Sequence, residues 1–399
     1  MTKIKSSLSP EYTLLRYCAQ IGISDAIKNK LDKILEADLY WPFILAESRK
    51  EGVACLLYHN LSQFKNKIPP DILSRLEETY CTNAYRNVKI YDAIASVLSL
   101  IHKEGLKMIP LKGLFLAEKV YNDIGLRAII SDIDLLVKKE DLPSIERLLE
   151  NLGYSMRVHK KLLYLAMKKS YMNSVEFLKP ETNLPNLHVH WHILNISLPT
   201  YLYSKKIDMS AFWKSAQPTK IADASAWQFA WHHLIMHLSE HALKHSFDRL
   251  ILLSDIDAVV KVCKSQIDWQ KLIAESLAYG MKKQLFYSLY FAHHYLDTPV
   301  PDHVLSGLKP ENTGWAEKIF FSAVLKNQRD TTLCYFVYLG MVKGIIAKIK
   351  FVFRSLFAPP CILALTFNLK NPRVGIGDYF SFIAKQLFHL KKSISPTAQ

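Results

Sequence analysis

The strongest constraint on the fold is a short strand pattern, Asp-Ile-Asp-Leu-Leu-Val, at residues 132–137. Because side chains alternate between the two faces of a strand, Asp132 and Asp134 share one face, and the opposite face meets a core. Two neighbouring carboxylates repel each other, and burying them without partners costs free energy. The arrangement becomes favourable when a divalent cation lies between them. A solvated strand edge with two incidental acids is the alternative interpretation.

The spacing of apolar residues changes twice along the chain. In residues 1–105 apolar side chains recur every three or four positions, which predicts helices, and the same spacing returns after Pro199. Between these parts, short extended runs alternate with helical ones, which predicts a small α/β unit. Its later strands are expected at 154–158, 173–179 and 187–193.

We therefore expect an α+β protein in which a small α/β core is flanked by a helical region before it and a larger helical region after it. The expected parts are an N-terminal helical region at 1–105, the core at 106–195, a helical domain at 196–300, and a linker with a basic amphipathic helical tail at 301–399.

The composition favours a folded protein of a reducing compartment. Half of the 399 residues are hydrophobic, which excludes a disordered chain. The six cysteines are scattered without a Cys-x-x-Cys pair, and the first residues lack the apolar segment of a signal peptide. We therefore expect a cytoplasmic protein.

Positive charge is concentrated at the C-terminal end. From residue 331 onward there are nine Lys and Arg residues against one acid, Asp378, so this segment carries about eight of the fifteen net positive charges. Apolar residues also form one stripe there, on an expected helix that spans 342–356. Such a segment is attracted to anionic lipid or to a nucleic-acid backbone, and a basic surface without a dedicated partner is the alternative. No run of 18 apolar residues is uninterrupted, so we expect peripheral contact with the inner membrane face and no membrane span.

Residues that suit phosphate binding precede the Asp-x-Asp strand. Lys112 and Gly113 follow an extended run and open an expected helix. The glycine lets the backbone approach a ligand, the helix N-terminus offers free N–H groups, and the lysine adds a point charge. Arg127 lies five residues before Asp132 and can hold the same anion with its guanidinium fork. Groups of this kind, followed by paired carboxylates, suit metal-dependent phosphoryl or nucleotidyl transfer.

Taken together, these motifs resemble the uncharacterised minimal nucleotidyltransferases of the DNA polymerase β superfamily. The likeness rests on Leu111-Lys112-Gly113, Arg127, the Asp-Ile-Asp-Leu-Leu-Val strand and Gly153-Tyr154. It continues through the pairs His190-Trp191, His241-Ala242, Arg249-Leu250, Asp255-Ile256 and Asp268-Trp269. In the superfamily the first glycine loop is usually Gly-Ser, whereas this chain has Lys-Gly, as this family does.

The resemblance implies a polymerase β-type core and a Mg²⁺-dependent (or Mn²⁺-dependent) reaction. Asp132 and Asp134 would hold the metal, with one ion bridging an NTP triphosphate and a second lowering the pKa of an acceptor hydroxyl. Lys112, Gly113 and Arg127 would bind the triphosphate. The products would be a nucleotidylated acceptor and pyrophosphate. The acceptor could be a small molecule, a sugar, a protein or an RNA end, and DNA is not expected.

One position departs from the family pattern. The third carboxylate of the site typically lies two residues before the His-Trp pair, where this chain has His188. A neutral imidazole suits Mg²⁺ poorly. Glu176, on the preceding expected strand, is a substitute if the strand register allows it. The alternative function is therefore a nucleotide-binding scaffold with weak or no turnover, associated with the membrane surface through its basic tail.

Histidines recur every four residues on one later helix, at 233, 237, 241 and 245. A pair of them could share a metal ion, but all four could not, since each step of four drifts about 40° around a helix. We expect this stripe to line the cleft, where His241 and Arg249 contact the substrate, and packing histidines are the alternative. Asp255 and Asp257 diverge by about 200° on a helix, so we interpret them as structural or cleft-lining.

Overall fold

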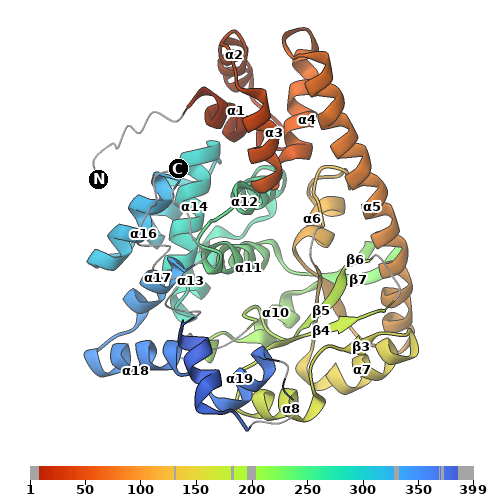
Figure 1. The fold of residues 1–399 in the computed structure, drawn as a ribbon, viewed down its shortest axis with the longest axis vertical. Helices are drawn as coiled ribbons and strands as arrows, with labels where there is room; N and C mark the ends of the chain where they lie inside the picture. Colours follow the sequence, from red (N-terminus) through yellow and green to blue (C-terminus); the bar gives the residue numbers. More distant parts are fainter. Residues whose placement is uncertain are drawn as a thin grey trace.

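The computed structural model describes residues 9–129, 132–180, 184–195, 204–327, 332–367, 369 and 373–384. The N-terminal helical region is confirmed over its described residues. It contains α1 (Pro10–Cys18), α2 (Asp25–Ile34), α3 (Trp41–Lys50), α4 (Ala54–Leu61), the 3₁₀ helix η1 (Ser62–Lys67) and α5 (Pro70–Lys103). The first helices and the start of α5 enclose an apolar cluster of their own. The rest of α5 runs along one side of the sheet (Figure 1).

The central sheet has five strands in the order β1-β2-β5-β4-β3. They are β1 (Met108–Pro110), β2 (Asp132–Val137), β3 (Ser155–Met156), β4 (Ser174–Leu178) and β5 (Asn186–His190). Strands β2 and β5 are parallel, and the other neighbours are antiparallel. Between the strands lie α6 (Lys112–Lys119), η2 (Lys139–Asp141), α7 (Leu142–Asn151) and α8 (Lys160–Lys168). The α+β class expected from the sequence is confirmed, although β3 is shorter than expected and β5 ends at His190.

A two-stranded hairpin lies where the sequence predicted only helices. Strands β6 (Gln217–Ile221) and β7 (Ala224–Gln228) pair antiparallel around Ala222 and Asp223, which both have positive φ, 47° and 60°. Two positive φ values suit the tight turn of a hairpin, but that turn usually contains Asn-Gly or Asp-Gly. The Ala-Asp pair gives no such signal, so the prediction was wrong here. The hairpin packs beside β1 and α5.

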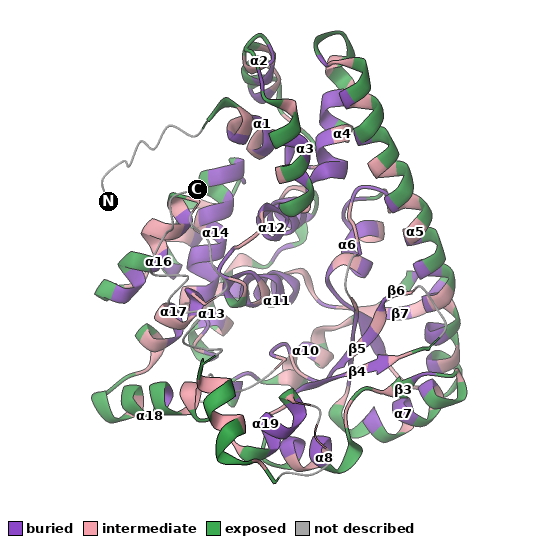
Figure 2. Cartoon of the chain, in the orientation of Figure 1, coloured by how far each residue is buried: buried purple, intermediate pink, exposed green. Residues whose placement is uncertain are grey.

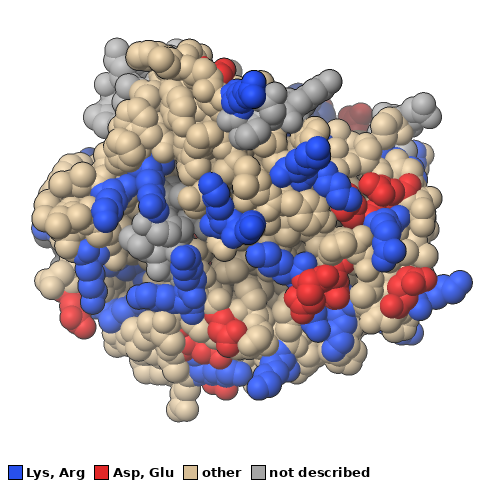
Figure 3. Space-filling view, turned by 90° about the horizontal axis from the view of Figure 1, so that it is seen from below, with Lys and Arg blue, Asp and Glu red and all other residues tan. Residues whose placement is uncertain are grey.

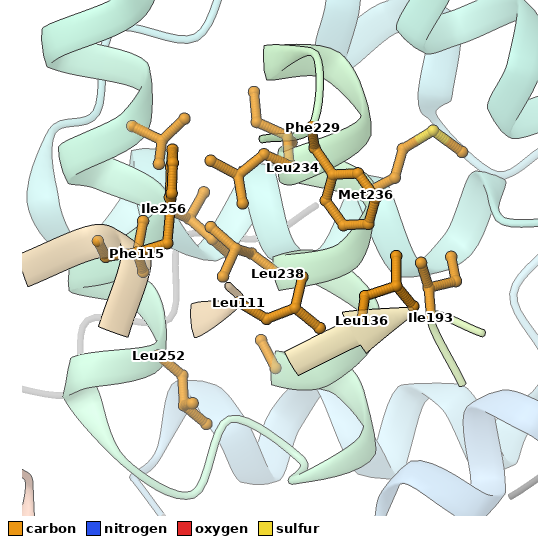
Figure 4. Close-up of a cluster of buried hydrophobic side chains, with 14 of the residues drawn as sticks. Leu111, Phe115, Leu136, Ile193, Phe229, Leu234, Met236, Leu238, Leu252 and Ile256 are labelled. Carbon is orange, nitrogen blue, oxygen red and sulfur yellow. The ribbon is translucent and has the colours of Figure 1, made fainter. Parts of the chain in front are cut away.

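The larger helical region covers one face of the sheet (Figure 1). It contains α10 (Met209–Ser215), α11 (Trp231–Lys244), α12 (Leu250–Cys263), η3 (Lys264–Gln266), α13 (Trp269–Ala278), α14 (Lys282–Leu296), α15 (Asp302–Leu308), α16 (Trp315–Leu325) and α17 (Cys334–Met341). Leu136 of β2, Phe115 of α6, Leu238 of α11 and Ile256 of α12 are drawn in one buried apolar cluster (Figure 4). Helices α11, α12 and α14 are largely buried (Figure 2). This packing fixes α11 and α12 against the face that carries the two aspartates.

The C-terminal segment contains two described helices, α18 (Ile345–Leu356) and α19 (Pro360–Thr366). Helix α19 packs against α8 in a small separate apolar cluster. The expected amphipathic helix is confirmed as α18, whose apolar stripe is largely exposed. Four of the basic residues counted in the tail, Lys370, Lys385, Lys391 and Lys392, lie outside the described residues. The four part boundaries stay a prediction.

Candidate active site

Two aspartates and two histidines meet on one face of the sheet. The parallel register of β2 and β5 pairs Asp134 with His188. The His188 Nδ1 atom lies 3.2 Å from Asp132 Oδ2 and 3.4 Å from Asp134 Oδ1. His190 Nε2 lies 2.8 Å from the same Asp134 oxygen. The expectation that Asp132 and Asp134 share a face is therefore confirmed, and His188 and His190 lie on that same face of the sheet.

Lys112 completes the set of contacts to Asp134. Its ammonium lies 2.8 Å from Asp134 Oδ1, and both side chains are buried. Lys112 begins α6 with a left-handed backbone, φ 48°, which costs a residue with a Cβ about 1 kcal/mol or more. The Leu111 N–H donates to the Asp134 carbonyl oxygen at 2.9 Å and fixes the chain just before this turn. The strained residue thus places a buried ammonium against a buried carboxylate.

The protein itself compensates the charge of Asp134. Burial opposes ionisation, but Lys112, His188 and His190 together hold the pKa of Asp134 well below its usual range. Burial alone would lower the pKa of His188, yet hydrogen bonds with Asp132 and Asp134 raise it. Burial and the neighbouring His188 lower the pKa of His190 to about 3, so His190 is neutral near pH 7. It therefore donates its one ring N–H to the Asp134 carboxylate.

The loop that leads into β2 is held by the long helix α5. The Asn83 side-chain amide donates to the Gly125 carbonyl oxygen at 2.7 Å, and Asn87 donates to the Arg127 carbonyl oxygen at 2.9 Å. A Cβ on Gly125 would lie 2.5 Å from the Tyr80 ring, so only glycine fits there. These contacts fix the backbone from which Arg127 reaches the cleft.

Arg127 makes a contact that the sequence did not predict. Its Nε and Nη2 atoms each lie 2.7 Å from a carboxylate oxygen of Asp255 on α12, and Nη1 donates to the Ala128 carbonyl oxygen at 2.6 Å. The Tyr121 hydroxyl also donates to Asp255, at 3.0 Å. The guanidinium fork that we expected to hold a phosphate is therefore engaged by Asp255. Asp255 is structural, as one of our two interpretations held.

These groups border a cleft of about 260 Å³ between the sheet, α11, α12 and the N-terminal helices. It is lined by Gly52, Lys112, Gly113, Arg127, Ala128, Ile129, Asp132, Asp134, Asn195, His241, Lys244, His245, Arg249, Ile251 and Leu252. All the sequence-predicted site residues except His188 are in this set, and His188 contacts both lining aspartates. A Cβ on Gly113 would meet its nearest neighbours at 3.6–3.7 Å. An alanine side chain would therefore fit at this position without displacing its neighbours.

Basic side chains and histidines from the helical region line one side of the cleft. Helix α11 brings Lys244 and two histidines to it, and Arg249 precedes α12. Burial, followed by Lys112 and His245, lowers the pKa of His241 well below its usual value. Burial and the nearby Lys244 and Lys112 lower the pKa of His245 to about 4. Both histidines are therefore neutral near pH 7, and burial is the main cause, with the neighbouring ammonium groups adding to it.

A family of uncharacterised nucleotidyltransferases matches residues 37–297 of the chain. The protein belongs to this family. Its match begins within the N-terminal helices, in agreement with the contribution of Gly52 to the cleft of the nucleotidyltransferase.

The chain was also compared with curated proteins and with solved structures. No curated protein matches the chain. The solution structure of the antibiotic-resistance factor ANT(2″)-Ia matches 52% of this chain and 98% of that chain, at 14% identity and a TM-score of 0.32.

Several residues that the sequence analysis considered as possible metal ligands or cleft residues lie apart from the cleft. Glu176 is opposite His188 in the register, but its carboxylate lies 2.6 Å from Arg157 and it does not line the cleft. His233 is buried against Glu275, two helical turns from His241. Of the four histidines in this stripe, only His241 and His245 therefore line the cleft. Lys244 and Gly52 are cleft residues that the sequence analysis missed, because neither belongs to a recognised motif.

The aspartate pair fits a divalent cation. Carboxylate oxygens of Asp132 and Asp134 both lie within 3.4 Å of one atom, His188 Nδ1, so they converge on a common point. Carboxylates supply the hard oxygen ligands of Mg²⁺ and Mn²⁺. His188 adds a ring nitrogen within reach of the same point, and nitrogen favours Mn²⁺ over Mg²⁺. The residues present therefore fit the divalent metal that nucleotidyl transfer uses.

Proposed function

We propose that this protein transfers a nucleoside monophosphate from an NTP to a hydroxyl acceptor, with Mg²⁺ or Mn²⁺ held by Asp132 and Asp134. The observation that supports this function is the cleft itself. It places two converging carboxylates beside Lys112, Lys244 and Arg249, next to the backbone of Gly113. That combination suits a metal-bound triphosphate.

In the proposed reaction the acceptor oxygen forms a bond to the α-phosphorus. The bond between the α-phosphorus and the oxygen that bridges to the β-phosphate breaks, and pyrophosphate leaves with its electron pair. When bound, the metal neutralises charge on the phosphates and lowers the pKa of the attacking hydroxyl. The hydroxyl proton passes to water in the cleft.

The cationic residues of the cleft position the leaving group. The Lys112 ammonium is buried beside Asp134, and Lys244 and Arg249 face the cleft from α11 and from the residue before α12. Pyrophosphate carries more negative charge as it departs, and fixed cations stabilise that charge at little reorganisation cost. His241 and His245, being neutral, supply hydrogen bonds to the same anion.

Incubation of the full chain with each of the four labelled NTPs and with Mg²⁺ or Mn²⁺ tests this function. Small-molecule, sugar, protein and RNA pools serve as acceptors in turn. We expect pyrophosphate release and transfer of label to one pool. NTP binding by calorimetry without release or transfer in any pool would contradict the transferase function and support the nucleotide-binding scaffold.

His188 is expected to set the metal preference. In a His188→Asp variant, the rate with Mg²⁺ relative to Mn²⁺ should rise about tenfold, because a third oxygen ligand replaces nitrogen. The melting temperature without metal should fall, since three carboxylates then repel one another, and Mg²⁺ should restore it. His192→Asn is the control, because His192 bonds Ser204 and Leu194 instead of the aspartates. An unchanged metal ratio in His188→Asp would show that this residue does not contact the ion.

We also propose that α18 contacts an anionic membrane surface. Its apolar stripe is exposed, with exposed fractions of 72% for Ile345, 67% for Ile346 and 58% for Phe353. Lys348 and Lys350 are exposed on the same helix, and no acid occurs between residues 331 and 377. Basic side chains are spread across this lower face of the molecule (Figure 3). Exposed apolar and basic side chains on one helix suit the interface of an anionic bilayer.

The same segment passes a length and composition test for a membrane span. Residues Ile345–Thr366 are long and apolar enough, with 39% of the tested window buried, which the sequence analysis had not predicted. The structure divides this stretch into α18 and α19 around Pro359 and Pro360, and α19 is packed on α8. We therefore favour surface contact by α18 over a span.

Flotation with liposomes tests the membrane proposal. We expect the full chain to bind vesicles with anionic lipid, to bind neutral vesicles weakly, and to dissociate as salt rises. Ile346→Asp should reduce binding at least about tenfold, since it places an acid on the apolar stripe. The exposed Val88→Asp on α5 is the matched control. Equal binding by wild type and Ile346→Asp would exclude α18 as the contact.

A further inference from the structure

A second group of metal-ligand side chains lies away from the cleft, where α11 meets α13. His232 and His233 occupy the first turn of α11, and Glu275 lies on α13. His233 Nε2 is 2.7 Å from Glu275 Oε2, and His232 Nε2 is 3.7 Å from the same oxygen. His232 Nε2 is buried and has no hydrogen-bond partner among the described residues. Three potential ligand atoms therefore face one another.

The hydrogen bonds around His233 decide which of its nitrogens carries the proton. The Ser215 hydroxyl donates to the carbonyl oxygens of Ala211 and Phe212, at 3.0 and 3.3 Å. Its single proton is thus in use, so it accepts from His233 Nδ1 at 2.8 Å. A neutral His233 then has a lone pair on Nε2, and that lone pair faces a Glu275 carboxylate oxygen. Two acceptors at 2.7 Å repel unless a proton or a cation lies between them.

A positively charged imidazole is energetically unfavourable at the position of His233. Both rings are buried, with centroids 4.2 Å apart, and the His233 ring is stacked on Phe212 at 3.8 Å. The N-terminus of α11 adds its positive dipole. In agreement with this setting, burial, followed by the adjacent His232 and by Lys271, lowers the pKa of His233 to about 3.

We propose that His232 Nε2, His233 Nε2 and Glu275 Oε2 bind a Zn²⁺ ion, at a site separate from the nucleotide cleft. Two imidazole nitrogens and a carboxylate are a known zinc ligand set, and ligand atoms of a tetrahedral zinc are about 3.3 Å apart. The separations of the two His Nε2 atoms from Glu275 Oε2, 2.7 and 3.7 Å, bracket that spacing. The Ser215 contact to His233 Nδ1 is the outer-sphere hydrogen bond that orients a ligating histidine. Glu275 is partly exposed, so water can complete the coordination.

The ion ties α13 to the first turn of α11. Helix α11 carries Lys244 and His245 to the cleft at its other end, so the site anchors the helix that presents the phosphate-binding cations. It acts as a structural link, independent of NTP.

Metal titration of the full chain without a histidine tag tests this proposal. After treatment with a chelator, the protein should bind one Co²⁺ at this site with the visible absorption of tetrahedral Co²⁺, and Zn²⁺ should displace it. Excess Zn²⁺ should raise the melting temperature by roughly 3–5 °C. The Co²⁺ absorption should be lost in His232→Gln, a change that leaves the His233–Glu275 contact in place, and in Glu275→Gln.

The Asp132→Asn variant is the matched control and should keep the Co²⁺ absorption, since it alters a cleft carboxylate and leaves the Lys112–Asp134 ion pair intact. Two results would overturn the proposal. One is a folded wild-type chain without tetrahedral Co²⁺ absorption, which would mean that a proton on Glu275 satisfies His233. The other is absorption that survives His232→Gln. Circular dichroism establishes that each variant is folded.

Discussion

Replacing Asp132 with Asn is expected to reduce NTP-dependent pyrophosphate release about 10³-fold while leaving the fold intact. The change removes one of the two proposed carboxylate ligands, and a catalytic metal ion supplies several kcal/mol of transition-state stabilisation. The Asp132 side chain is 33% exposed and contacts His188 at the cleft edge. Its loss therefore leaves no deeply buried charge without a partner. The measurements are the initial rate at saturating NTP and Mn²⁺ and the melting temperature.

Asp134→Asn is a useful comparison because it should reduce the stability of the protein as well as its activity. Asp134 is 6% exposed and compensates the buried ammonium of Lys112. Removing the charge of one partner in such a pair costs about 3–5 kcal/mol of stability. We expect this variant to lose both activity and stability, whereas Asp132→Asn loses activity alone. A fully active Asp132→Asn variant would show that the aspartate pair is not the metal site of this protein.

The sequence predicted the local parts of this site well. Side-chain alternation is a property of a single strand, so it placed Asp132 with Asp134 without knowledge of the fold, and it applies equally to His188 and His190 on β5. The pairing of β2 with β5, which brings the two aspartates to the two histidines, was implied only by the family resemblance. The register that puts Glu176 opposite His188 could not be read from the sequence, because it depends on the β4–β5 pairing.

Long-range contacts account for what the sequence missed. Arg127 and Asp255 are 128 positions apart, and no local pattern links a loop arginine to an aspartate on a distant helix. The same holds for Gly52, which reaches the cleft because the Glu51 carbonyl oxygen accepts from the Ile251 N–H at the start of α12. Each contact depends on how α12 docks on the sheet. That docking is a tertiary result of the apolar cluster around Leu136 and Ile256.

Arg127→Met is expected to destabilise the protein by about 3–5 kcal/mol, because it leaves the Asp255 carboxylate buried without its guanidinium partner. The Asp255 side chain is 3% exposed, and the Tyr121 hydroxyl is its other hydrogen-bond donor. A phosphate ligand without a structural role would leave the free energy of unfolding unchanged. Denaturant unfolding of the full chain without nucleotide separates these two roles.

A double-mutant cycle sharpens this test. Asp255→Asn in the Arg127→Met background removes the unpaired charge and should recover about half or more of the lost stability. Arg249→Met is the matched control, since the Arg249 side chain is 40% exposed and lines the same cleft. It should weaken NTP binding by calorimetry about tenfold and change stability by less than about 0.5 kcal/mol. If Arg127→Met instead behaves like Arg249→Met, with native stability and weaker NTP binding, then the fork binds phosphate and exchanges Asp255 for the nucleotide.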